Sequence, residues 1–144
     1  MIVLDTTILS YAVGGEHPLR EPTRRLMEAI GERGLAATTS VDVIQEFAHT
    51  YSRRRSRRLA AKYARGYATL LAPLLSPTES VLEAGLGLFE RHSGLDAFDA
   101  VLAAAAIEVG AQALVSADRG FRGIRGLDHV EPLSPAFDAL LRTA

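Results

Sequence analysis

Short apolar runs alternate with longer segments of helical spacing along most of this sequence. The runs at 2–4, 35–38 and 111–116 have the length and apolar content of buried strands. Parallel strands need long crossover connections, and helices that make these connections cover both faces of the sheet. The alternation therefore predicts an α/β protein of three layers, α/β/α, in which helices flank a short central parallel sheet.

Two further strands are expected, a very short one within 73–77 and a last one at 128–131. No linker or change of composition divides the chain, and its length suits one domain, 1–144. Apolar residues at helical spacing, with cap-type residues before them, predict the helices. They are expected at 7–13, 23–32, 41–51, 53–72, 79–92, 96–110 and 135–142.

Composition excludes several classes of function. The chain has no cysteine, which excludes disulfides, thiolate zinc sites and a cysteine nucleophile. The longest apolar run, 101–107, is too short to span a bilayer, and the start of the chain lacks a signal-peptide pattern. We therefore expect a cytoplasmic protein without a membrane segment. The net charge of −1 gives the molecule as a whole no bulk attraction for polyanions.

Asp5 directly follows the first apolar run and precedes the first expected helix. In open parallel sheets, ligands bind outside the carboxyl ends of the strands, which is where this side chain is expected. The alternative is that Asp5 only caps the helix, because Asp is a preferred N-cap residue. Asp5 alone does not distinguish a ligand from a cap.

Three more acids are expected at the same edge of the sheet. Asp118 follows another apolar run, Glu46 lies in a helix after a strand, and Asp99 lies in the first turn of an alanine-rich helix. Together with Asp5, these carboxylates would repel one another and raise one another's pKa values. A divalent cation such as Mg²⁺ or Mn²⁺, which prefers oxygen ligands, would relieve the repulsion.

Most acids in these segments also have a purely local explanation. Asp96 has the position of an N-cap, and Asp99 could complement the positive end of the same helix. Asp42 has near-capping-box spacing from the preceding threonine, and Asp118 could be a turn residue. Glu46 has no such explanation, because a carboxylate in mid-helix among apolar neighbours needs a partner.

Four stretches occur in an order and spacing that resemble a known family. They are MIVLDTTIL, VDVIQEF, LDAFDAVLAAAA and LVSADRGF, and together they extend from residue 1 to about residue 121. The pattern resembles the PIN-domain ribonucleases, and among them the VapC-type toxins of bacterial toxin–antitoxin pairs. The resemblance implies a PIN-like form of the three-layer fold.

The resemblance also implies a site. It makes Asp5, Glu46, Asp99 and Asp118 the catalytic acids that hold Mg²⁺ or Mn²⁺. At the auxiliary polar positions it places Thr7, where Asn or Ser is more usual, and Ser116, where Thr is common. Gly120 departs from the pattern, because an acid is common there, and this departure argues against a full second metal site. Whether Asp96 or Asp42 joins the site stays open.

The implied activity is metal-dependent hydrolysis of RNA phosphodiester bonds by a toxin. The implied partners are a VapB-type antitoxin and a second copy of the chain in a homodimer. Arg residues could hold the RNA backbone, since the planar guanidinium suits phosphate. Five of the fifteen arginines lie close together in the sequence. Instead of holding RNA, these five could form a solvated helix face or contact an acidic protein partner. They are Arg53, Arg54, Arg55, Arg57 and Arg58.

Two other functions remain open at this point. The first is an RNA- or protein-binding module with the same fold and no activity, although all four acids are intact. The second is a phosphatase that uses Asp5 as a nucleophile. Such enzymes resemble the haloacid dehalogenases and generally need a second Asp two residues later, where this chain has Thr7.

Overall fold

The computed structural model describes residues 1–142 and confirms a central parallel sheet, which has four of the five expected strands. Its strand order is β2-β1-β3-β4, so that the first strand lies inside the sheet with β2 and β3 as neighbours. The register places Val3 opposite both Thr38 and Leu114. Residues 143 and 144 lie outside the described part of the chain, and a single domain over 1–144 stays a prediction. The strands are β1 Ile2–Leu4, β2 Ala37–Thr38, β3 Ala113–Val115 and β4 His129–Val130.

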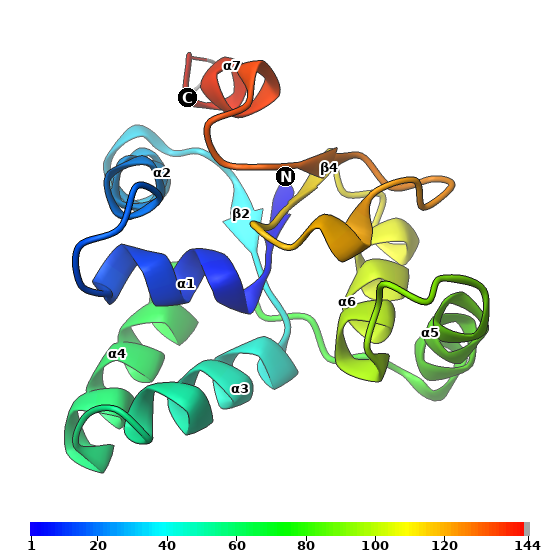
Figure 1. The fold of residues 1–144 in the computed structure, drawn as a ribbon, viewed down its shortest axis with the longest axis horizontal. Helices are drawn as coiled ribbons and strands as arrows, with labels where there is room; N and C mark the ends of the chain where they lie inside the picture. Colours follow the sequence, from blue (N-terminus) through cyan, green and yellow to red (C-terminus); the bar gives the residue numbers. More distant parts are fainter. Residues whose placement is uncertain (143–144) are drawn as a thin grey trace.

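Helices cover both faces of this sheet, as the α/β/α prediction requires. Figure 1 shows four of them, α1 to α4, on one side and the pair α5 and α6 on the other, while α7 lies beside α2. Within residues 1–142, no helix has both the length and the apolar character that crossing a bilayer requires. The helices are α1 Thr6–Val13, α2 Arg20–Arg33, α3 Val41–Ser52, α4 Arg57–Leu70, α5 Glu79–Arg91, α6 Ala97–Glu108 and α7 Pro135–Arg142.

Polar residues fix where the helices of the site begin. Asp5, Ser40 and Asp96 have extended backbones, and their side chains accept a backbone N–H from the first turn of α1, α3 and α6. Asp5 follows β1 directly, and Ser40 comes two residues after β2. The helix starts therefore lie at the carboxyl-end edge of the sheet, where their N–H groups favour negative charge.

Helices α5 and α6 form a closely packed pair. Gly85 lies so near to α6 that a Cβ atom at this position would be 2.8 Å from Val101 Cα. The alanines of α6 have short side chains, and Ala103 and Ala106 are completely buried. This packing fixes the position of the first turn of α6, which carries Asp99.

The segment 73–77 is not a strand, contrary to the sequence prediction. Its Leu75 makes only an isolated parallel bridge with Ser40, through hydrogen bonds with Thr39 and Val41 on either side. Pro73 and Pro77 bound the segment and lack the N–H that a longer ladder would need. The contact still ties the start of α3 to the connection between α4 and α5.

The helix expected over 53–72 begins four residues later than predicted. Arg54 and Arg55 donate their N–H groups to Tyr51 O and form a turn after α3. Ser56 has an extended backbone, and its hydroxyl accepts the Leu59 N–H as the N-cap of α4. The basic run therefore lies mostly on a connection between two helices, because a cap residue interrupts it.

Candidate active site

Asp5 is a buried carboxylate held in place by neighbours from the start of α1 and from the residue that follows β3. It is 2% exposed, and its Oδ2 accepts hydrogen bonds from Ser116 Oγ at 2.6 Å and Thr7 Oγ1 at 2.8 Å. The Thr7 N–H also donates to Oδ2 at 3.3 Å, so Asp5 does cap α1. Capping and a role in the site are therefore compatible, because the hydroxyl that follows β3 also contacts Oδ2.

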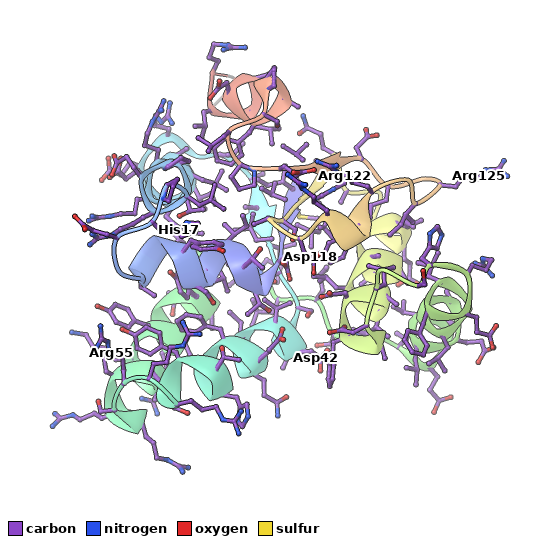
Figure 2. The ribbon with its side chains drawn as sticks, in the orientation of Figure 1. His17, Asp42, Arg55, Asp118, Arg122 and Arg125 are labelled. Carbon is purple, nitrogen blue, oxygen red and sulfur yellow. The ribbon has the colours of Figure 1, made fainter. Side chains whose placement is uncertain are left out.

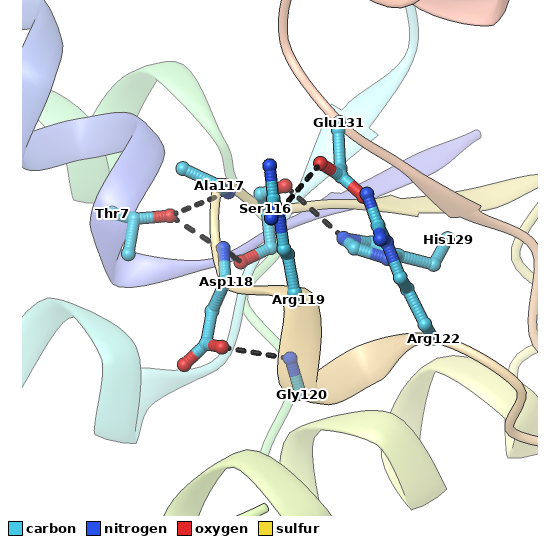
Figure 3. Close-up of polar contacts among 9 residues, drawn as sticks. All are labelled: Thr7, Ser116, Ala117, Asp118, Arg119, Gly120, Arg122, His129 and Glu131. Atoms are coloured by element: carbon cyan, nitrogen blue, oxygen red, sulfur yellow. Dashed lines mark hydrogen bonds and ion pairs between the residues drawn. The ribbon is translucent and has the colours of Figure 1, made fainter. Parts of the chain in front are cut away.

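Both hydroxyls around Asp5 also receive backbone N–H groups from the loop after β3. The Ala117 N–H donates to Thr7 Oγ1 at 3.0 Å, and the Asp118 N–H donates to Ser116 Oγ at 2.9 Å (Figure 3). Each hydroxyl donates its one proton to Asp5, and its lone pairs accept the backbone N–H groups of the loop. The two positions thus join the loop that carries Asp118 to the first strand.

Glu46 has the partner that a half-buried carboxylate in mid-helix needs. Its Oε2 accepts a hydrogen bond from Thr6 Oγ1 at 2.5 Å, across 40 residues of sequence. Thr6 is 8% exposed and follows Asp5 directly. The sequence reasoning singled out Thr7 and missed Thr6, although a hydroxyl directly after the carboxylate of a strand end was a usable signal.

Asp99 lies in the first turn of α6, where its N–H donates to Asp96 Oδ1 at 2.8 Å. Asp96 is therefore the N-cap of α6. Burial and the negative charges of nearby carboxylates together raise the pKa of Asp99 to about 8. Burial contributes most, followed by the charges of Asp5, Asp96, Asp118 and Glu46. Asp99 therefore lies near enough to the other three predicted acids to be repelled by each of them.

Asp118 caps a short 3-10 turn, Arg119–Phe121, by accepting the Gly120 N–H on Oδ1 at 2.8 Å. The turn packs against the loop before α6, since a Cβ on Gly120 would be 2.2 Å from Gly94 O. No side chain fits there, which explains why this chain lacks the acid expected beside Asp118.

A cleft of about 390 Å³ opens beside the acids. Glu46 and Asp99 line it, together with the exposed carboxylate Asp42 near the start of α3. Its other wall is apolar and includes Leu82 and the largely exposed Phe98. Asp42 thus lines the cleft, and Asp96 lies near enough to Asp99 for its charge to raise the Asp99 pKa, while neither belongs to the hydrogen-bonded group around Asp5.

Three of the four acids share a pattern that suits a cation. Asp5, Glu46 and Asp118 each use one carboxylate oxygen as a hydrogen-bond acceptor from the protein. Their second oxygens have no such donor in the part of the chain that the structure describes. Hard cations take oxygen ligands of this kind. Within residues 1–142, however, no three His, Asp or Glu side chains already form a ready-made metal ligand set.

The surroundings of Asp5 argue against the phosphatase alternative. A nucleophilic carboxylate must reach a phosphorus atom through an accessible oxygen, whereas Asp5 is almost fully buried. The second Asp of such enzymes is replaced by Thr7, whose hydroxyl proton is directed to Asp5. A carboxylate held in this way suits a fixed ligand better than an attacking group.

The basic run after α3 lies away from the acids. Its five arginines are all exposed, and Figure 2 shows Arg55 at the end of α3 opposite to Asp42. Seven residues of helix separate Glu46 from Arg53, which corresponds to roughly 10 Å along the axis. Contact between this run and RNA stays a prediction, and such contact would be remote from the acids.

Comparisons with known proteins agree on one family. The profile of the PIN domain matches residues 2–127. The chain is 49% identical to "Ribonuclease VapC7" of Mycobacterium tuberculosis over 142 residues, which is 98% of each chain. It is 28% identical to "Ribonuclease VapC13" of the same organism over 127 residues, or 88% of this chain and 97% of that one.

The fold agrees with a solved structure. A chain from the "Crystal structure of VapBC2 from Rickettsia felis bound to a DNA fragment from their promoter" superposes with a TM-score of 0.70. The match covers 92% of this chain and 99% of that chain at 19% sequence identity, a level that supports the common fold. The chain therefore belongs to the PIN-domain family, among relatives named as VapC ribonucleases.

Proposed function

We propose that this protein is a metal-dependent endoribonuclease that acts as the toxin of a toxin–antitoxin pair. The observation that carries the proposal is the group of four carboxylates at the carboxyl-end edge of the sheet, in which the charges of Asp5, Glu46 and Asp118 all act on Asp99. Three of them keep one oxygen without a protein donor among residues 1–142. The family and the VapC ribonucleases among its relatives support RNA as the substrate.

Asp5, Glu46, Asp99 and Asp118 would hold Mg²⁺ or Mn²⁺ in this proposal. A bound cation of this kind lowers the pKa of water toward neutrality and offsets charge on a phosphoryl group. The protein then needs no nucleophilic side chain, in agreement with the absence of cysteine.

The residues around the acids would have positioning roles. Thr7 and Ser116 fix one oxygen of Asp5 and hold the loop that carries Asp118. Thr6 fixes one oxygen of Glu46. These contacts restrict the carboxylates before a ligand binds, which reduces the ordering that binding would otherwise require.

The proposed partners follow from the relatives. The solved neighbour is a VapBC complex by its title, and we extend this pairing to a VapB-type antitoxin that inhibits the present chain. A homodimer is proposed on the same family grounds and is tested by the mass of the purified protein in solution. The apolar residues Leu82 and Phe98 beside the cleft offer surface for either contact.

The test compares the wild type with Asp99→Asn on a structured RNA in the presence and absence of Mn²⁺. We expect metal-dependent cleavage by the wild type and loss of cleavage in the variant, with an unchanged circular dichroism spectrum. Asp138→Asn, an exposed carboxylate on α7, serves as the matched control and should cleave normally. Equal cleavage by Asp99→Asn would refute the site, whereas RNA binding without cleavage by the wild type would favour the inactive binding module.

A further inference from the structure

The segment 119–127 consists of three consecutive triplets with the pattern Arg-Gly-apolar, RGF, RGI and RGL. It starts directly after Asp118 with the 3-10 turn Arg119–Phe121 and ends shortly before β4. We call it the RG segment. The proposed catalytic roles leave it unused, and Arg119 and Arg122 are the arginines nearest in sequence to a site carboxylate.

The triplets place their apolar residues in the core. Phe121 is fully buried, Ile124 is 3% exposed, and Leu127 is half-buried and packs against the core. Gly123 and Gly126 have φ values of +74° and +82°, which side chains rarely adopt. Each triplet is thus anchored by one apolar side chain, and glycine turns the chain between triplets.

The arginines of the three triplets are exposed. The side chains of Arg119 and Arg122 are 77% and 56% exposed, and Arg125 extends away from the body of the molecule in Figure 2. Because consecutive arginines are three residues apart, extended backbone limits the separation of their Cα atoms to roughly 10 Å. The arginines therefore form a short series that starts at Asp118.

Acidic neighbours neutralise this series only in part. Glu131 pairs with Arg122 and lies 3.8 Å from Arg119 Nε, so that one carboxylate serves two guanidinium groups (Figure 3). Asp128 and Glu131 line the same broad depression as Arg122. In the described part of the chain, Arg125 has no ion pair or hydrogen bond from its side chain. With the site carboxylate Asp118 left aside, the series carries three positive charges against the two negative charges of Asp128 and Glu131.

This excess matters because the adjacent site is strongly acidic. Four carboxylates repel a polyanionic substrate, and bound cations offset only part of this repulsion. A guanidinium at the rim can pair with phosphate in two parallel hydrogen bonds. The RG segment provides such groups directly after Asp118 in the chain, with the guanidinium groups of Arg119 and Arg122 directed toward Glu131 and away from the Asp118 carboxylate (Figure 3). The basic run 53–58 lies at the far end of α3 (Figure 2).

We propose that Arg119, Arg122 and Arg125 bind the phosphate backbone of the RNA strand that enters the site. The proposal rests on the ribonuclease function above and assigns the path of the substrate beyond the cleaved bond. The apolar anchors of the RG segment hold the arginines on a rigid border, so that phosphate contacts need little ordering of the backbone. Phosphate contacts position RNA without reading its sequence.

The test measures binding rather than cleavage. A mixed-sequence single-stranded RNA of twelve nucleotides is titrated with Asp99→Asn protein at several salt concentrations. The second protein carries R119Q, R122Q and R125Q in the same background. Each lost phosphate contact should reduce the slope of log K against log salt by about 0.7, so that the triple variant loses about 2. R125Q alone, which breaks no described ion pair, should lose about 0.7.

The matched control removes three exposed arginines elsewhere, with R24Q, R25Q and R65Q on α2 and α4. An unchanged slope in the triple variant of the RG segment, or an equal loss in this control, would overturn the proposal. Loss of binding to an acidic protein partner with RNA binding intact would also overturn it. Because binding is measured in an inactive background, the result does not depend on whether the wild type cleaves RNA.

Discussion

Gly85→Ala should destabilise the protein because the added methyl group has no space between α5 and α6. Its Cβ would be 2.8 Å from both Val101 Cα and Val101 Cγ2 and 3.0 Å from Val101 N. Two of these atoms are backbone, so a change of rotamer does not relieve the contact and α6 must move. Overpacking of this kind costs roughly 1–3 kcal/mol, and alanine recovers about 1 kcal/mol through its helix propensity. Since the backbone cannot yield locally, we expect a net loss of about 1–2 kcal/mol.

Urea unfolding followed by circular dichroism measures this change in the free energy of unfolding. The midpoint should fall with an unchanged m-value, and Tm should fall by roughly 2–4 °C for each kcal/mol in a chain of this size. Gly66→Ala is the matched control, since Gly66 lies inside α4 without a positive φ, and a Cβ there would meet no atom within 4 Å. It should stabilise by about 0.5–1 kcal/mol. A Gly85→Ala protein as stable as the wild type would refute the steric argument.

Three further predictions concern hydrogen bonds and protons. Thr6→Val should lower kcat for RNA cleavage by about tenfold or more, because a hydrogen bond to a charged group contributes roughly 1.5–3 kcal/mol, and Thr6→Ser should retain activity. Mn²⁺ affinity, measured by calorimetry, should rise from pH 6 to pH 8 by up to about tenfold per pH unit. The reason is that Asp99, with a pKa of about 8, is protonated over this range, so that protons compete with the cation. An affinity independent of pH would contradict this linkage. Tyr67→Phe should lower the free energy of unfolding by about 1 kcal/mol, since the buried hydrogen bond that the Tyr67 hydroxyl donates to Leu9 O at 2.8 Å is lost; an unchanged urea midpoint would argue against a contribution of that bond.

The sheet and most helices could be predicted because their signals are local. An apolar run of the right length predicted β1, and cap residues such as Ser40 and Thr78 marked the starts of α3 and α5. The errors also have local causes. Pro73 and Pro77 limit the apolar pair Leu74 and Leu75 to a single bridge. Ser56 caps α4, which therefore starts at Arg57 and not at residue 53.

The contacts of the site were less predictable because they join distant parts of the chain. The four acids were predicted partly from strand ends and partly from the family resemblance. The bond from Thr6 to Glu46 and the fixation of Asp5 by Ser116 cross 40 and 111 residues, and no spacing rule identifies such pairs. The RG segment was missed for a different reason. Its triplets are too short to show the hydrophobic periodicity of either a helix or a strand, so a search for those periods does not detect the segment.

The bond between Asp5 and Ser116 has a consequence for protein synthesis. Asp5 is made first, yet the hydroxyl that fixes it and the strand beside it come from the last quarter of the chain. A ribosome-bound chain that ends before residue 113 has neither β3 nor Asp118, and its four-carboxylate site does not exist. The four-carboxylate site is therefore completed only after β3 and Asp118 have been synthesised, and we expect the proposed activity to appear only then.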